Sequence, residues 1–100
     1  MINVKIEKEN AKYKKITMTG HAMYDDYGKD IVCAAASSIA TTTINGVLAL
    51  NKESLGYEVS DKGLVIEVKD TFDTTQTLIN NMVNLLKDLE EQYPENIEVK

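Results

Sequence analysis

The sequence predicts an α+β fold in the order ββαββα(β), with an antiparallel sheet covered by two helices. Two pairs of short runs alternate apolar and polar residues, as half-buried strands do: residues 2–8 with 13–19, and 55–59 with 64–68. A longer run with apolar residues at helical spacing follows each pair. Because only a few residues join the strands of each pair, we expect local antiparallel hairpins rather than a doubly wound parallel sheet.

The first hairpin occupies the N-terminal fifth of the chain. Its first strand alternates the apolar residues Ile2, Val4 and Ile6 with polar ones. Residues 9–11 (Glu-Asn-Ala) predict the turn, and Gly20 ends the second strand. His21 is therefore expected at the tip of a strand, where its side chain is held firmly and reaches solvent.

A loop and a long helix are predicted next. Residues 22–29 (AMYDDYGK) contain turn-forming residues, including Gly28, whose backbone adopts angles that other residues resist. Asp30 predicts an N-cap for a helix that begins at Ile31. Apolar side chains then recur at helical spacing for about five turns, and the helix should end between residues 51 and 53.

A second hairpin and a second helix complete the fold. Residues 60–63 (Ser-Asp-Lys-Gly) predict the turn between the second pair of strands. Asp73 and Gln76 fit a capping box at the start of the second helix, and Pro94 should stop it. Residues 97–99 are expected to add a last short strand.

Length and composition predict one cytoplasmic domain, residues 1–100. Apolar residues make up 43% of the chain and charged residues 27%, an ordinary globular balance. We expect no transmembrane helix, because no apolar run is near membrane-spanning length, and no signal peptide, since the N-terminus alternates apolar and polar residues. The net charge of −5 and pI of about 4.8 disfavour nucleic acid as a direct partner and favour a basic peptide or protein. With one cysteine no intrachain disulfide forms, which is typical of a reducing compartment.

The stretch from Gly20 to Ser38 contains the one histidine, His21, and the one cysteine, Cys33. If Asp30 caps the helix, Cys33 lies in its first turn, where unpaired N–H groups and the helix dipole stabilise a thiolate. His21 could act as general base or pair with the thiolate. The N–H groups near Cys33 would form an oxyanion hole. These are the parts needed for cysteine-dependent acyl transfer, including peptide hydrolysis.

A third group should orient the imidazole of His21. Asp30 is the first candidate, and Asp25 and Asp26 are alternatives. Ser37 is one helical turn after Cys33 and could hydrogen-bond near the thiol. The three carboxylates also oppose the hypothesis, because nearby negative charge disfavours a thiolate.

Other interpretations of the same residues stay open. A lone cysteine is commonly a small buried apolar residue, and a lone histidine after a strand is commonly structural. One Cys and one His make a poor zinc site, so we expect no metal and no cofactor. The chain could be a non-catalytic binding or assembly module. It could also be a redox sensor, although it has no resolving cysteine.

The motif Gly20-His21-Ala22, Tyr24, Gly28, Asp30-Ile31-Val32-Cys33-Ala34-Ala35 and Ser37 resembles the signature of the ribosomal-processing cysteine protease family, called Prp. The motif spans about a fifth of the chain, and the predicted element order is compatible with that family's fold. We see no clear departure from the family pattern within it.

The resemblance implies a cysteine endopeptidase that removes a short N-terminal extension from a large-subunit ribosomal protein precursor. It makes Cys33 the nucleophile and His21 its base, with Asp30 and Ser37 as supporting residues. Gly20, Tyr24 and Gly28 would belong to a mobile loop that closes over the substrate. The resemblance also implies a hydrophobic groove for an aromatic-rich apolar segment, and a homodimer.

Overall fold

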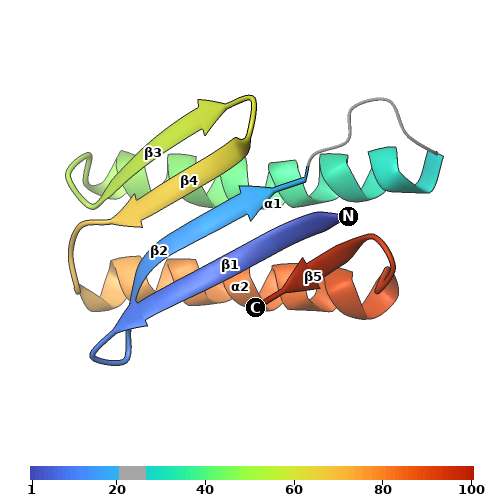
Figure 1. The fold of residues 1–100 in the computed structure, drawn as a ribbon. Coiled ribbons are helices and arrows are strands. Elements are labelled where there is room, and N and C mark those ends of the chain that lie inside the picture. Colours follow the sequence, from blue (N-terminus) through green and yellow to red (C-terminus); the bar gives the residue numbers. More distant parts are fainter. Residues whose placement is uncertain (21–26) are drawn as a thin grey trace.

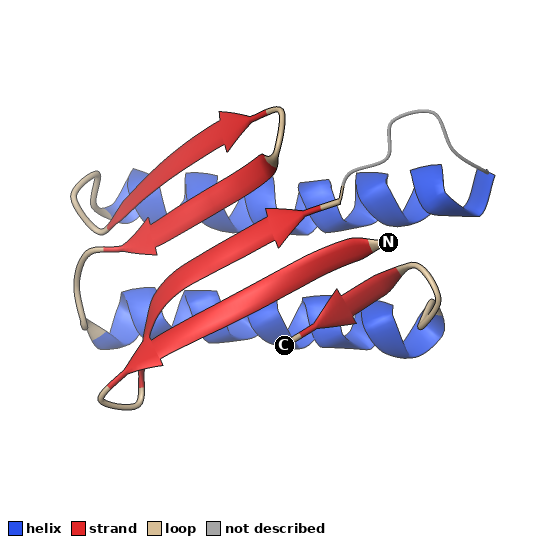
Figure 2. Cartoon of the chain, in the orientation of Figure 1, coloured by secondary structure: helices blue, strands red, loops and turns tan. Residues whose placement is uncertain are grey.

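The computed structural model describes residues 1–20 and 27–100, and the side chains of these residues except those of 27–30. Its elements are β1 (Ile2–Glu9), β2 (Lys12–Thr19), α1 (Tyr27–Leu50), β3 (Leu55–Ser60), β4 (Gly63–Val68), α2 (Asp73–Gln92) and β5 (Ile97–Val99). The strands form a five-stranded sheet in the order β3-β4-β2-β1-β5. Both helices cover the same face of this sheet (Figures 1 and 2), so the predicted α+β fold is confirmed.

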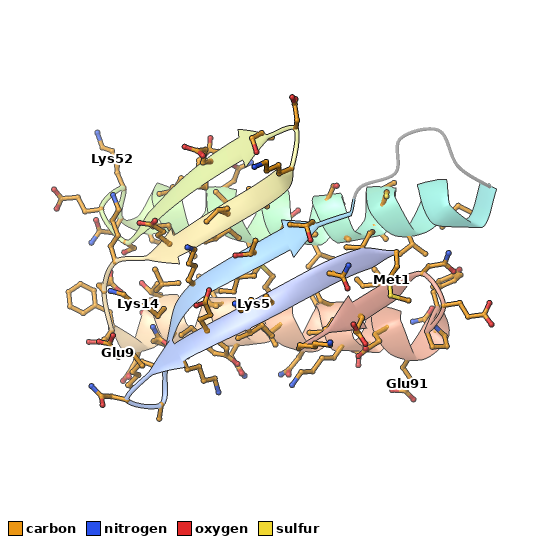
Figure 3. All side chains as sticks on the ribbon, viewed as in Figure 1. Met1, Lys5, Glu9, Lys14, Lys52 and Glu91 are labelled. Carbon is orange, nitrogen blue, oxygen red and sulfur yellow. The ribbon has the colours of Figure 1, made fainter. Side chains whose placement is uncertain are left out.

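The core lies between the helices and the sheet. Each strand turns alternate side chains toward the helices. Val4 is buried, whereas its neighbour Lys5 is exposed on the open face of the sheet, where Figure 3 labels it. Cross-strand pairs continue this alternation, because Val4 lies opposite Met18 and Lys5 lies opposite Thr17. The sheet therefore has one apolar and one polar face, as the sequence pattern predicts.

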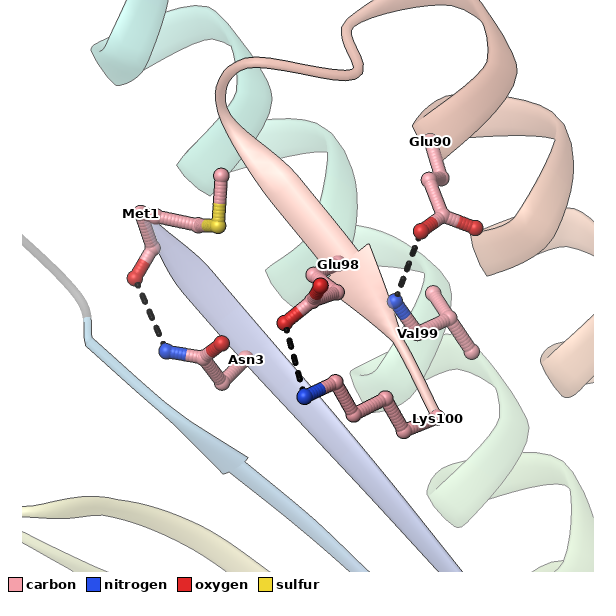
Figure 4. A network of polar contacts seen from close by, with 6 residues as sticks. All are labelled: Met1, Asn3, Glu90, Glu98, Val99 and Lys100. Atoms are coloured by element: carbon pink, nitrogen blue, oxygen red, sulfur yellow. Dashed lines mark hydrogen bonds and ion pairs between the residues drawn. The ribbon is translucent and has the colours of Figure 1, made fainter.

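The C-terminal strand β5 differs from the other strands in direction. It runs parallel to β1, whereas the other neighbouring strands are antiparallel. The Lys100 N–H donates to the Val4 carbonyl at 2.8 Å, and the Val99 N–H donates to Glu90 Oε2 at 3.1 Å. Figure 4 shows the second of these bonds beside the Glu98–Lys100 ion pair of 3.4 Å. These contacts hold β5 against both β1 and α2.

Helix α1 corrects one sequence expectation. Residues Ile31–Leu50 are long and apolar enough to cross a membrane by length and composition, although we expected no such segment. The same helix supplies the core with a buried stripe at helical spacing: Val32, Ala36, Ala40, Ile44 and Val47. The core helix of a soluble protein passes the same length and composition test, and the buried stripe is the side by which α1 packs on the sheet.

The start of α2 corrects a second expectation. Phe72 is the N-cap, and no side chain caps the helix there, so the predicted Asp73–Gln76 capping box is wrong. The buried Gln76 side chain instead points at the first hairpin. Its Oε1 accepts from the Tyr13 N–H at 2.8 Å, and its Nε2 donates to the carbonyls of Tyr13 and Asp70, both at 3.2 Å. Gln76 therefore joins α2 to β2. The three bonds pair the donor and acceptor groups of its buried amide, which would be costly to leave unpaired.

Candidate functional site

A groove of about 500 Å³ lies between α1 and the β3–β4 hairpin. Its helical wall consists of Cys33, Ala34, Ser37, Thr41, Ile44 and Asn45. Its sheet wall consists of Met18, Tyr57, Val59, Ser60, Asp61, Gly63 and Leu64. Most of these side chains are apolar or uncharged, and Asp61 is the one charged residue in the described lining. The groove therefore suits an apolar ligand with a cationic group near Asp61.

The groove is open because the outer part of β3 is not covered by a helix. Leu55, Tyr57 and Val59 share one face of β3, since strand residues alternate. Leu55 is buried in the core, whereas Tyr57 is 56% and Val59 72% exposed. The inner, apolar face of β3 thus continues past the part that α1 covers. Tyr57 and Val59 are therefore apolar side chains exposed together on the helix side of the sheet. Such a cluster is typical of a binding site.

Cys33 lies on the helical wall of this groove. Its side chain is half-buried and packs against the core. Ser37 follows one helical turn later and is exposed on the same wall, as its spacing predicts. The thiol of Cys33 and the hydroxyl of Ser37 therefore face one cavity.

The position of Cys33 within α1 corrects the predicted geometry. The helix begins at Tyr27, one turn before the predicted start at Ile31. Gly28 is therefore a helical residue rather than part of a loop, and Asp30 is not the N-cap. An aspartate is favourable anywhere in the first turn of a helix, so its presence did not distinguish the cap from the residues after it.

This earlier start moves Cys33 into the second turn, because one turn takes 3.6 residues. The unpaired N–H groups of a helix belong to its first four residues. The dipole effect also falls off within the first turn. The predicted oxyanion hole at the Cys33 amide and the predicted first-turn stabilisation of its thiolate therefore do not follow from this helix.

Before α1, the last residue that the structure describes is Gly20, directly after β2. This residue has a φ of +85°, and a Cβ there would overlap the Met1 carbonyl oxygen, so only glycine fits without rearrangement. Gly20 thus lies after the end of β2, against the backbone at the start of β1. The predicted site residues His21 and Tyr24, and the alternatives Asp25 and Asp26, lie outside the described residues.

The sheet wall of the groove was not predicted from the sequence as part of a site. The alternation of Leu55, Tyr57 and Val59 does place them on one face of a strand. This alternation identifies a shared face of the strand, but not a site. To recognise the face as the wall of a groove, one must also know how long α1 is and where it lies over the sheet. Asp61 similarly looked like a turn former and nothing more.

Comparisons with known proteins cover the whole chain. The profile of a family described as cysteine protease Prp matches residues 1–98. A ribosomal processing cysteine protease Prp of Staphylococcus aureus (strain Mu50 / ATCC 700699) is 34% identical over 101 residues, which span 97% of this chain and 95% of that protein.

Two solved structures of an essential ribosomal processing protease Prp from S. aureus also match. One, in complex with a substrate peptide, has a TM-score of 0.90 at 34% identity and covers 100% of this chain and 98% of that one. The other, with a covalently linked product peptide, has a TM-score of 0.87 at the same identity and coverage.

Proposed function

This chain belongs to the cysteine protease Prp family and is a ribosomal-processing cysteine protease, and we propose that it removes a short N-terminal extension from a large-subunit ribosomal protein precursor. Cys33 is the proposed nucleophile and His21 the proposed base. One observation carries this assignment: Cys33 lies on the wall of an open groove lined mainly by uncharged side chains. A peptide bound in that groove would lie against the thiol.

The proposed reaction has two steps. The Cys33 sulfur attacks the carbonyl carbon of the scissile peptide bond, and the thiol proton passes through His21 to the leaving amine. The peptide C–N bond breaks, which leaves a thioester between Cys33 and the N-terminal extension. Water then attacks this thioester and gives one proton back to Cys33 through His21. The products are the extension with a new carboxylate and the mature protein with a new amino terminus.

Further residues support this reaction in the proposal. Ser37 faces the same groove one turn after Cys33 and is proposed to hydrogen-bond near the reacting atoms. Asp30 is proposed to orient the pair from within the first turn of α1, rather than as its cap. Gly20, Tyr24 and Gly28 are proposed to help position the substrate.

The test is cleavage of co-expressed ribosomal protein precursors, with their N-termini determined by mass spectrometry. We expect the wild-type chain to remove an extension, and Cys33→Ala or His21→Ala to leave it intact. Ser38→Ala is the matched control, because Ser38 is exposed on α1 but does not line the groove. Wild-type cleavage by Cys33→Ala would overturn the assignment.

We also propose that the protein works in the cytoplasm as a homodimer, without contacting membrane or nucleic acid. The exposed side of α1 supports this, because residues 31–50 contain no charged side chain. Surfaces depleted in charge are typical of the centre of protein interfaces. Thr42 is exposed on this helix and does not line the groove. Sedimentation velocity should give a dimer for the wild type and a monomer for Thr42→Arg, and a wild-type monomer would contradict the proposal.

A further inference from the structure

Strand β3 lies at an edge of the sheet. Among the strands that the structure describes, it has β4 as its one neighbour. The Lys69 N–H donates to the Ser54 carbonyl at 2.8 Å, so Ser54 faces β4. In an antiparallel pair the backbone groups of successive residues point alternately toward the partner and away from it. Leu55, Tyr57 and Val59 therefore turn their N–H and C=O groups to the open edge.

Two of these three residues, Tyr57 and Val59, also face the groove with their side chains. Tyr57 and Val59 line the groove and are more than half exposed. Natural edge strands usually protect themselves with lysine, proline or a bulge, and the sequence of β3, LGYEVS, contains neither lysine nor proline. At these two positions the backbone hydrogen-bonding groups and an apolar side-chain surface are available to one ligand.

The dimensions of the groove fit an extended peptide. On α1 the lining reaches from Cys33 to Asn45. At 1.5 Å per residue this is about 18 Å along the helix. An extended chain advances about 3.3 Å per residue, so about five residues span the groove. The thiol is at one end of this length, where a strand laid along β3 would present a peptide bond to it.

We propose that the substrate peptide binds as an additional strand on the edge of β3. Its backbone pairs with Tyr57 and Val59, and every second side chain enters the groove between β3 and α1. This inference rests on the proposed proteolytic function of the groove and specifies how the groove recognises its substrate. Recognition then depends mainly on the backbone, with apolar side chains preferred at alternate positions.

The test is a backbone N-methylation scan of the substrate peptide crystallised with the S. aureus protease, labelled with fluorescein. Binding to the Cys33→Ala protein is measured by fluorescence anisotropy, so that catalysis does not contribute. N-methylation removes one N–H donor at a time. We expect a period of two: at least tenfold weaker binding when the methylated N–H points at β3, and less than threefold when it points away.

A substitution in the protein gives an independent measurement. Val59→Pro removes the N–H that points to the open edge and leaves the β3–β4 ladder bonds in place. We expect at least fivefold weaker binding than for Val59→Ala, which keeps the N–H, with unchanged far-UV circular dichroism. Absence of binding by the peptide, or weakening that does not alternate along it, would overturn strand addition. Loss of cleavage in Cys33→Ala is scored separately, so the protease assignment can stand while strand addition fails.

Discussion

Truncating Val59 to alanine should weaken substrate recognition beyond any effect that the truncation has on stability. Val59 is 72% exposed in the protein without substrate, and its side chain lies on the groove side of β3. The substitution removes two carbons, each contributing about 0.8 kcal/mol when fully buried. If the substrate covers the area now exposed, the loss is about 1.2 kcal/mol, or roughly sevenfold in kcat/KM, since 1.4 kcal/mol is tenfold.

Val65→Ala is the matched control for this substitution. Val65 lies in the same hairpin, opposite Glu58, and its side chain projects from the open face of the sheet. Both substitutions lose the β-branched side chain that strands favour, a cost of up to about 1 kcal/mol. Both should therefore lower the urea midpoint to a similar extent, and only Val59→Ala should lower kcat/KM.

The assay is cleavage of a fluorogenic peptide at substrate concentrations well below KM. Equal kcat/KM values for Val59→Ala and the wild type would refute the inference that the inner face of β3 contacts the substrate. Equal losses for Val59→Ala and Val65→Ala would attribute the effect to hairpin stability instead.

Three further predictions concern the scaffold and are measured by urea unfolding. Gln76→Leu removes three hydrogen bonds and leaves the Tyr13 N–H without its Gln76 acceptor, so it should lower the free energy of unfolding by about 2–3 kcal/mol. The control Gln92→Leu, at an exposed position of the same helix, should change it by less than about 0.5 kcal/mol. Similar losses for the two variants would contradict the bridging role of Gln76. Gly63→Ala should lower the free energy of unfolding by about 2 kcal/mol or more, because φ is +133° and an added Cβ would overlap the Met18 carbonyl oxygen. An unchanged free energy of unfolding would contradict that close approach. Ala11→Gly should stabilise by about 0.5–1 kcal/mol, since Ala11 has a φ of +66° in the first hairpin turn, and a loss of stability would contradict the strain assigned there.

The elements could be predicted from the sequence because their signals are local. Alternation in Ile2, Val4 and Ile6 identifies a half-buried strand without knowledge of its partner. The turn residues between β3 and β4 fix their pairing, because a short connection allows only a hairpin. The start of α1 was predicted one turn late, since Asp30 is equally compatible with a cap and with a position inside the first turn.

Polar side chains with more than one available partner were harder to predict. Gln76 has a partner within its own helix in the capping-box pattern, and the sequence favours that local partner. In the folded chain Gln76 meets the Tyr13 backbone, which is distant in sequence. Which bond forms is decided by the packing of α2 on the first hairpin.

The sequence by itself determined the chemistry of this protein: one thiol, one imidazole, and the spacing that relates them to a protease family. Those properties depend on residue identity and order. The tertiary structure decided that Cys33 faces a groove, and that Tyr57 and Val59 form its opposite wall. That arrangement follows from where α1 crosses the sheet and how far β3 extends past it, and both are set by the packing of segments distant in sequence.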